Sequence, residues 1–333
     1  MSDVAGVILW VGVVFYAVFG GADFGAGFWD LTAGGAGRGR RPRALIDAAV
    51  GPVWEANHVW LIFCLVVLWT AFPSAFAAIM TTLGIPLAIA AFGIVVRGSG
   101  FAFLRVSTRL SRQRMFGIAF ATSSVITPFF LGTVAGGIAS GRVPVGGNGD
   151  PIESWVNPTS ILGGVFAVVV CAYLAAVFLV YEANRRRDEA LVDAFRARAI
   201  GAAVVAGVVS VAGLFVLADD APRLHDRLLG TALPVVVVSV LLGLAALVLL
   251  VRRAAAYARV AAAAAVAAVI GGWGIAQYPN VLGTRFALDR AAAPATTLAW
   301  VLGIFVAAVV LIGPSLVWLY VLAQRGELSE PDR

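Results

Sequence analysis

The chain has 333 residues, of which 61% are hydrophobic and 13% are charged, whereas an ordinary soluble domain carries about 25% charged residues. This composition excludes a soluble globular protein and indicates an integral membrane protein. The formal net charge is +6, but every basic residue is an arginine, and the arginines lie in short segments between apolar runs. That arrangement is typical of membrane topology and argues against nucleic-acid binding.

Nine apolar runs are long enough to cross about 30 Å of hydrocarbon at about 1.5 Å per helical residue. They predict an all-α integral membrane protein with nine transmembrane helices in a single membrane domain, residues 1–333. The N-terminus has no basic stretch like that of a cleavable signal peptide, so we expect the first run to be a retained helix. The predicted helices cover residues 4–29, 51–72, 75–96, 116–139, 157–181, 200–218, 229–251, 257–277 and 297–322.

The arginines predict the orientation of these helices. The segments after the first, third, fifth and seventh helices hold 17 arginines, and the even-numbered segments hold 5. Because positive residues are retained in cytoplasmic loops, the N-terminus is expected outside and the C-terminus in the cytoplasm. The segment after the third helix is expected to hold Arg97, Arg105, Arg109, Arg112 and Arg114.

Few ionisable groups remain at membrane depth. The first helix holds Asp23 and, near its end, Asp30, and the second holds Glu55 and His58, whereas the other seven helices have essentially none away from their ends. A charged side chain in hydrocarbon costs at least about 2.5 kcal/mol, so such groups normally face a bundle interior and mark an ion or proton route. The predicted topology places both Asp23 and Glu55 towards the cytoplasmic side.

Glu55 and His58 are three residues apart and therefore share one helix face, while Asn57 points away from Glu55. A buried carboxylate beside an imidazole is suited to a proton relay. The alternative is that the two side chains satisfy each other and the nearby backbone. Axial haem ligation by His58 is disfavoured because the second histidine, His225, falls in a predicted outer loop.

Neither a haem nor a metal site is therefore expected in this chain. Cys64 and Cys171 have no CxxC spacing, so they do not indicate a metal cage or a disulfide framework.

Small residues surround Asp23 in the segment "GGADFGAG", where Gly21 and Gly25 have GxxxG spacing. Glycines at this spacing let another helix approach closely, which would hold Asp23 in a helix interface and out of the lipid. The alternative is a packing seam with an incidental acid. The tract Ala261–Ala265 favours a similar close approach in the eighth helix, unless it only reflects amino-acid usage.

Several motifs together resemble subunit II of the cytochrome bd quinol oxidases: "GGADFGAG", "GPVWEANHVWLIF", "GGWGIAQYPNVL", "AAAPATTLAWVL" and "GPSLVWLYVL". The resemblance implies two four-helix bundles plus a peripheral helix, paired with a similarly folded subunit I. It further implies that subunit I carries two b haems and haem d, oxidises quinol and reduces oxygen to water. Subunit II would support assembly and contribute to the proton route, and in some members it holds a quinone where its partner holds haem.

Carried over by position, the acid of the first motif falls on Asp23 and the acid of the second on Glu55. The resemblance places a Trp-x-x-Asn frame on Trp54 and Asn57, and Trp60 near an oxygen passage. The chain departs from the family pattern with glutamate at Glu55 in place of aspartate, and histidine at His58 in place of glutamine or glutamate. The expected proton pathway is Glu55, Asp23 and His58, supported by Trp54, Asn57, Trp60, Gly21 and Gly25.

The expected partners are the haem-bearing subunit I, membrane lipid, and quinol or quinone, with a small accessory subunit as a further option. The expected location is the bacterial cytoplasmic membrane, and no cofactor is expected to bind this chain directly apart from an optional structural quinone. The main alternative function is a proton-coupled transporter using Asp23 and Glu55, although no inverted repeat supports it. A purely structural scaffold is a third alternative, and it leaves the buried acids unexplained.

Overall fold

The computed structural model describes residues 1–35, 37–50, 54–107, 109–283 and 286–325. Side chains of residues 54–57, 105, 110, 320 and 323–325 also lie outside the description. In the described ranges the regular elements are helices, apart from a small antiparallel ribbon made by β1 (Asn280–Leu282) and β2 (Phe286–Ala287).

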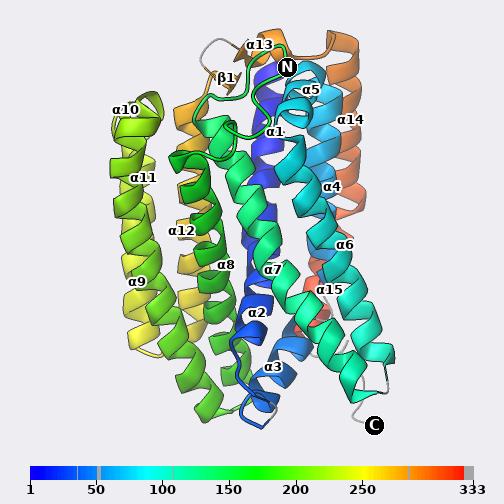
Figure 1. Ribbon diagram of the computed structural model, residues 1–333, viewed down its shortest axis with the longest axis vertical. Helices are drawn as coiled ribbons and strands as arrows, with labels where there is room; N and C mark the ends of the chain where they lie inside the picture. The colour runs from blue at the N-terminus through cyan, green and yellow to red at the C-terminus, as the bar shows by residue number, and fades with distance from the viewer. Residues whose placement is uncertain (36, 51–53, 108, 284–285, 326–333) are drawn as a thin grey trace.

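The chain forms its elements in the following order (Figure 1). They are α1 (Ser2–Phe15), the π-helical turn η1 (Tyr16–Gly20), α2 (Gly21–Leu31), α3 (Arg40–Val50), α4 (Trp54–Ala71), α5 (Pro73–Thr82), α6 (Gly84–Val106), α7 (Leu110–Ala139), α8 (Pro158–Arg185), α9 (Glu189–Asp220), α10 (Pro222–Leu229), α11 (Leu233–Val251), α12 (Ala255–Gln277), β1, β2, α13 (Leu288–Ala291), α14 (Ala295–Leu311) and α15 (Gly313–Arg325).

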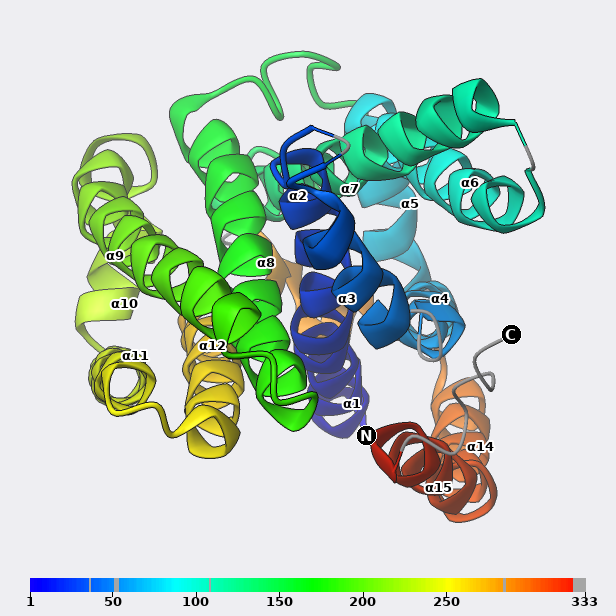
Figure 2. The ribbon, with the colours of Figure 1, turned by 90° about the horizontal axis from the view of Figure 1, so that it is seen from below.

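The long helices run roughly along the long axis of the molecule, as Figures 1 and 2 show. Among the described residues, eight helices are long and apolar enough to cross a membrane, or nine if the bent pair α4 and α5 counts as one span. The prediction of nine crossings matches the upper count. Seen from below in Figure 2, α9 and α11 lie at one side of the molecule, and α6 and the α14–α15 pair lie at the other.

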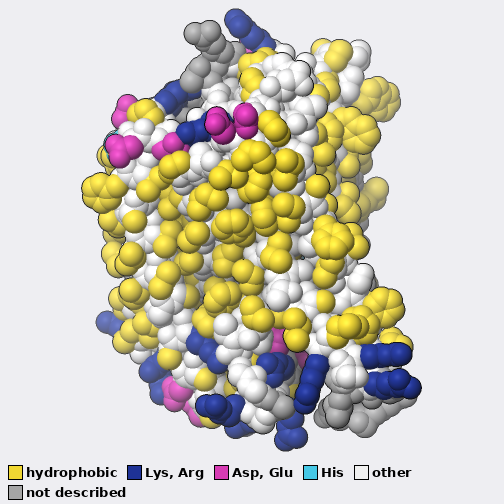
Figure 3. All heavy atoms as spheres, in the orientation of Figure 1, with side chains coloured by type: hydrophobic (Ala, Val, Ile, Leu, Met, Phe, Trp, Pro, Cys, Tyr) yellow, Lys and Arg dark blue, Asp and Glu magenta, His cyan; other side chains and the backbone are white. Residues whose placement is uncertain are grey.

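The face shown in Figure 3 carries a broad hydrophobic band, with charged side chains towards the two ends of the long axis. The long helices also expose large apolar side chains, including Phe92 at 69% exposure, Val208 at 63% and Ile304 at 65%. Such a belt is stable only in contact with lipid or another apolar protein surface. We call the two ends the α3 end and the α10 end; the arginines gather mainly at the α3 end.

Proline determines the sharpest bend. Pro73 has no backbone N–H to donate, and a residue before proline is disfavoured in the helical region. Phe72 accordingly has φ −135° and ψ 59°, and the chain turns by 117° between α4 and α5. The short helix α5 therefore lies at the α10 end, and α6 begins a new crossing (Figure 1).

Several predicted helix boundaries were wrong, the first because of the bend at Pro73. The predicted helix 75–96 is two helices, of which α6 is the crossing. Helix α9 begins at Glu189 instead of residue 200, because the Asp188 carboxylate caps it by accepting the Leu191 N–H at 3.1 Å. The last predicted helix is interrupted between α14 and α15, and neither α3 nor α10 was predicted.

The largest core cluster joins α2, α3, α8, α9, α11 and α12. Fully buried alanines make up much of this cluster, including Ala175 and Ala176 of α8 and Ala258 and Ala262 of α12. Small side chains let helix axes approach closely, so van der Waals contact between backbones replaces the larger side chains of a soluble core. The predicted packing role of Ala261–Ala265 is confirmed for Ala262, which lies in this core.

Candidate functional site: a buried ion pair beside α4

The first crossing changes its helical register just before the Asp23 segment. Residues Tyr16–Gly20 form a π-helical turn between α1 and α2, and such insertions are frequent at functional sites. The Tyr16 hydroxyl is buried and makes no hydrogen bond within the described part of the chain. Gly20 leaves room for the Tyr16 ring, since a Cβ atom there would lie 3.1 Å from it.

Glycine allows α2 to pack directly against two neighbouring helices. A Cβ atom at Gly25 would overlap the carbonyl oxygen of Cys171 in α8, and one at Gly27 would overlap the Ser124 side chain of α7. Asp23, four residues before Gly27 and so on the same side of α2, is 3% exposed. The prediction that the GxxxG spacing holds Asp23 in a helix interface is therefore confirmed.

Asp23 pairs with Arg97, an arginine in the middle of α6. The Arg97 guanidinium donates from Nη2 to Asp23 Oδ1 at 2.8 Å and from Nη1 to Oδ2 at 3.0 Å. A further Nη2 bond reaches the Asp23 carbonyl oxygen at 3.1 Å. Both side chains are almost fully buried, at 1% and 2% exposure. This bidentate geometry, with two parallel N–H···O bonds, is the strong form of an arginine–carboxylate pair.

The rest of the Arg97 guanidinium contacts a hydroxyl group and two aromatic rings. Its Nε donates to the Ser124 hydroxyl at 2.9 Å, and the guanidinium lies between the rings of Phe24 and Phe120, 4.9 and 4.7 Å from their centroids. Aromatic faces stabilise a cation without accepting a hydrogen bond. The site is therefore a neutral unit of two fixed charges, held by α2, α6 and α7.

The placement of Arg97 corrects a prediction from the sequence. We expected Arg97 in a cytoplasmic loop after the third helix, and we expected no ionisable group in the interior of that helix. The residue instead lies within α6, buried, because Asp23 balances its charge. A signal was present: apolar residues continue beyond Arg97 in "IVVRGSGFAF", so the arginine does not mark the end of the hydrophobic run.

The second motif lies at the start of α4, beside this pair. The His58 ring is 6.1 Å from the ring of Phe24, which also contacts Arg97. His58 is therefore one aromatic ring away from the buried guanidinium. Trp54, Glu55 and Asn57 belong to the first turn of α4, but their side chains lie outside the described residues.

Trp60, the remaining aromatic residue of this motif, packs against the first crossing. Its ring stacks on Phe15 at 4.6 Å and meets the edge of Phe63 at 6.3 Å. Gly21, the other half of the GxxxG spacing, faces α8, since a Cβ atom there would lie 3.2 Å from Leu174. These contacts join α4 and α8 to the span that carries Asp23.

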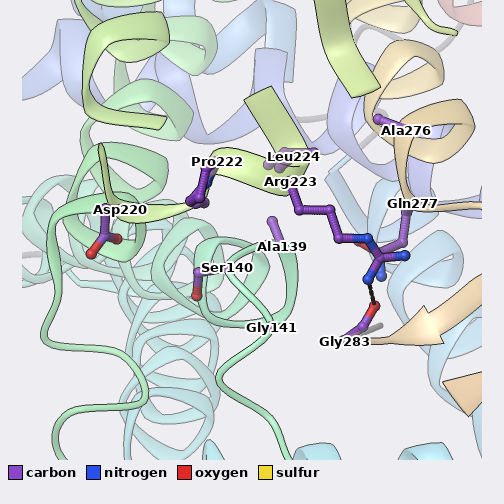
Figure 4. Close-up of a pocket in the computed structure, with 11 residues that line it drawn as sticks. Ala139, Ser140, Gly141, Asp220, Pro222, Arg223, Leu224, Ala276, Gln277 and Gly283 are labelled. Carbon is purple, nitrogen blue, oxygen red and sulfur yellow. Dashed lines mark hydrogen bonds between the residues drawn. The ribbon is translucent and has the colours of Figure 1, made fainter. Parts of the chain in front are cut away.

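A cavity of about 120 Å³ lies at the α10 end, where α7, α9 and α12 terminate (Figure 4). In Figure 4 Arg223 extends towards Gly283, whose carbonyl oxygen accepts its Nη1 hydrogen bond at 2.8 Å. Asp220 lies on the opposite side and accepts hydrogen bonds from Arg142 and Thr159. The residues predicted as functional do not line this cavity, so it is a separate junction between helix ends.

The family model described as "Cytochrome bd terminal oxidase subunit II" matches residues 1–323. The chain belongs to this family. Among its subunit II relatives, "Cytochrome bd ubiquinol oxidase subunit 2" of Bacillus subtilis (strain 168) is 27% identical over 175 residues, which are 52% of this chain and 50% of that protein. "Cytochrome bd-I ubiquinol oxidase subunit 2" of Escherichia coli (strain K12) is 25% identical over 182 residues, 51% of this chain and 46% of that protein.

These alignments span about half the length of the curated subunit II relatives that they match. The similarity in fold to a solved structure extends over more of the chain than these sequence alignments. A chain in "The structure of bd oxidase from Geobacillus thermodenitrificans" matches with a TM-score of 0.76 at 24% identity, covering 96% of this chain and 98% of that one. The recognition of a cytochrome bd subunit II from the sequence motifs is therefore confirmed.

Proposed function

We propose that this chain is the non-haem subunit II of a respiratory oxidase that couples quinol oxidation to the reduction of oxygen to water. It would work as a heterodimer with a haem-bearing subunit I, which carries haems b and d. The observation that carries the proposal is the family match over residues 1–323. The curated relatives are named as subunits of ubiquinol oxidases, which favours an oxidase over a proton-coupled transporter. The accessory subunit and a structural quinone remain predictions.

We propose that the whole chain forms one membrane domain in a bacterial cytoplasmic membrane, with two four-helix bundles and a peripheral helix. With nine crossings, the N-terminus would lie outside and the C-terminus in the cytoplasm. The concentration of arginines at the α3 end supports this orientation, because positive residues are retained on the cytoplasmic side (Figure 3). The α3 end would then face the cytoplasm.

Within the complex, we propose that Glu55 carries protons from the cytoplasmic side, assisted by His58 and Asp23. The contact of His58 with Phe24 supports the proposal, because it brings the start of α4 next to the buried pair. Arg97 holds the Asp23 carboxylate in place through two hydrogen bonds. Asp23 would therefore act through its fixed charge and its position, and Glu55 would bind and release the proton.

The test compares Glu55→Gln with the wild-type heterodimer. Glutamine keeps the shape and hydrogen bonding of the side chain but cannot carry a proton, so the variant should assemble with full haem content and lose most quinol-driven oxygen consumption. His58→Gln, which restores the usual residue of the family, should lose little. Glu153→Gln, in the exposed loop at the α10 end, is the matched control and should keep the wild-type rate.

Two results separate the parts of this proposal. If Glu55→Gln turns over at the wild-type rate with intact haems, Glu55 is structural and the proton route is wrong, while the oxidase assignment stands. If the chain purified from its native membrane brings no haem-bearing partner and no optical haem spectrum, the oxidase assignment itself fails.

A further inference from the structure

A groove of about 590 Å³ lies between the first crossing, α3, α8 and α12, towards the α3 end. Its walls are mostly apolar, and the α12 wall is made of small side chains, including Ala263, Ala264 and Ala267. Two residues of its lining, Phe15 and Val260, are 38% and 63% exposed. The groove therefore opens on the hydrophobic surface of the molecule, where lipid chains would be its neighbours.

Three charged side chains line the groove: Asp23, Glu182 and Arg259. The first two are balanced within the protein, Asp23 by Arg97 and Glu182 by Arg185, whose Nη1 lies 3.2 Å from a Glu182 carboxylate oxygen. Among the described side chains that line the groove, the charge of Arg259 is the one that no acid balances.

Arg259 is held in place by an aromatic ring instead of an acid. Its guanidinium carbon is 3.7 Å from the centroid of the Tyr181 ring. Within the described part of the chain it forms neither a hydrogen bond nor an ion pair, so its N–H donors stay available. Stacking fixes the plane of the guanidinium without using those donors.

We infer that this groove binds one anionic phospholipid, with an acyl chain along the α12 wall and the phosphate on Arg259. The charge at the mouth selects an anion, and the length of apolar wall behind it selects an anion with a hydrocarbon chain. The arginine lies one turn into α12 from the α3 end, so in a membrane it would lie near the level where lipid headgroups meet the acyl chains. Basic pockets between transmembrane helices bind such headgroups.

Other occupants fit the groove less well. A free phosphate ion would satisfy Arg259 but leave the apolar wall empty. A neutral isoprenoid molecule such as a quinone would fill the wall but leave the guanidinium donors without an acceptor, and an unmet charged donor costs more than an unmet neutral one. A zwitterionic phospholipid brings a second, positive group close to Arg259.

The experiment uses the purified heterodimer after extensive detergent washing, with bound lipid counted by native mass spectrometry. Phosphatidylglycerol, phosphatidylcholine and inorganic phosphate are titrated in parallel. Arg259→Gln should weaken phosphatidylglycerol binding about tenfold, and Arg259→Lys, which keeps the charge, should retain most of it. Ala264→Leu should fill the groove and reduce binding even with Arg259 intact.

Two variants at the same end of the molecule serve as controls. Arg253→Gln removes an exposed arginine that is already paired with Glu189 and Asp193, and Ala256→Leu enlarges an exposed residue of α12. Both should bind phosphatidylglycerol like the wild type. The inference is overturned if Arg259→Gln binds it unchanged, if phosphatidylcholine binds equally well, if inorganic phosphate displaces it, or if the occupant extracted from the native complex is an uncharged quinone.

Discussion

Removing both partners of the Asp23–Arg97 pair should destabilise the protein less than the sum of the two single removals. Arg97→Gln leaves a carboxylate with 2% exposure without its counter-ion, and breaking such a buried pair costs about 3–5 kcal/mol. Asp23→Asn leaves the buried Arg97 guanidinium without its counter-ion. In the double variant Asp23→Asn/Arg97→Gln no unbalanced charge remains, so we expect it to recover at least about 2 kcal/mol relative to the sum of the single costs.

The assay is unfolding of the purified complex in mixed micelles, followed by helical circular dichroism, for the wild type and all three variants. Should the single variants fail to accumulate, the amount of the chain in the membrane, measured by immunoblot, gives the same ranking. Arg253→Gln removes a half-exposed arginine, at 52% exposure, and should change stability little. Additive costs in the double variant would refute the reasoning, because they would mean that the two charges do not depend on each other.

Three further predictions follow from other contacts. Gly25→Val should prevent accumulation of the complex, because its side chain would overlap the α8 backbone, whereas Gly243→Val, with no neighbour within 4 Å, should accumulate normally in immunoblots. The Leu191 N–H at the start of α9, together with Arg41, lowers the pKa of Asp188. The contribution of the Asp188 carboxylate to stability is therefore present at neutral pH and is lost as pH falls below about 4. Asp188→Ser keeps a helix cap but has no carboxylate, so its thermal stability should depend less on acid pH. A reporter fused after Arg325 should be cytoplasmic, and one fused within Gly146–Gly149 should be external; the reverse result at either site contradicts the topology.

The local part of the site could be predicted from the sequence. Gly21 and Gly25 have a spacing that allows close packing of a neighbouring helix, so the burial of Asp23 could be predicted from a short segment. Arg97 could not be placed in the same way, because its burial depends on a partner 74 residues earlier in the chain. Hydropathy treats an arginine as the end of a span, and only the folded contact makes it stable inside one.

The fold shows the same division between local and distant causes. Long apolar runs predicted the crossings well. Helix α9 begins 11 residues before the predicted start, because its first turns are polar on one side and pack Phe195 and Ala199 into the core. The bend at Pro73 had a local signal, but its consequence, that α5 does not cross, depends on where the neighbouring helices lie.

The buried arginine also has a consequence for how the protein is made. A single arginine at the centre of a helix raises the cost of membrane insertion by about 2.5–3.5 kcal/mol. Synthesis proceeds from the N-terminus, so the acid of α2 is already in the membrane when α6 leaves the ribosome and the translocon. Asp23 can then neutralise Arg97 as it arrives, and Ser124 of α7 follows later with its hydroxyl. On this order of synthesis the first crossing would provide the counter-ion for a later one, and a defect at Asp23 would act during membrane insertion.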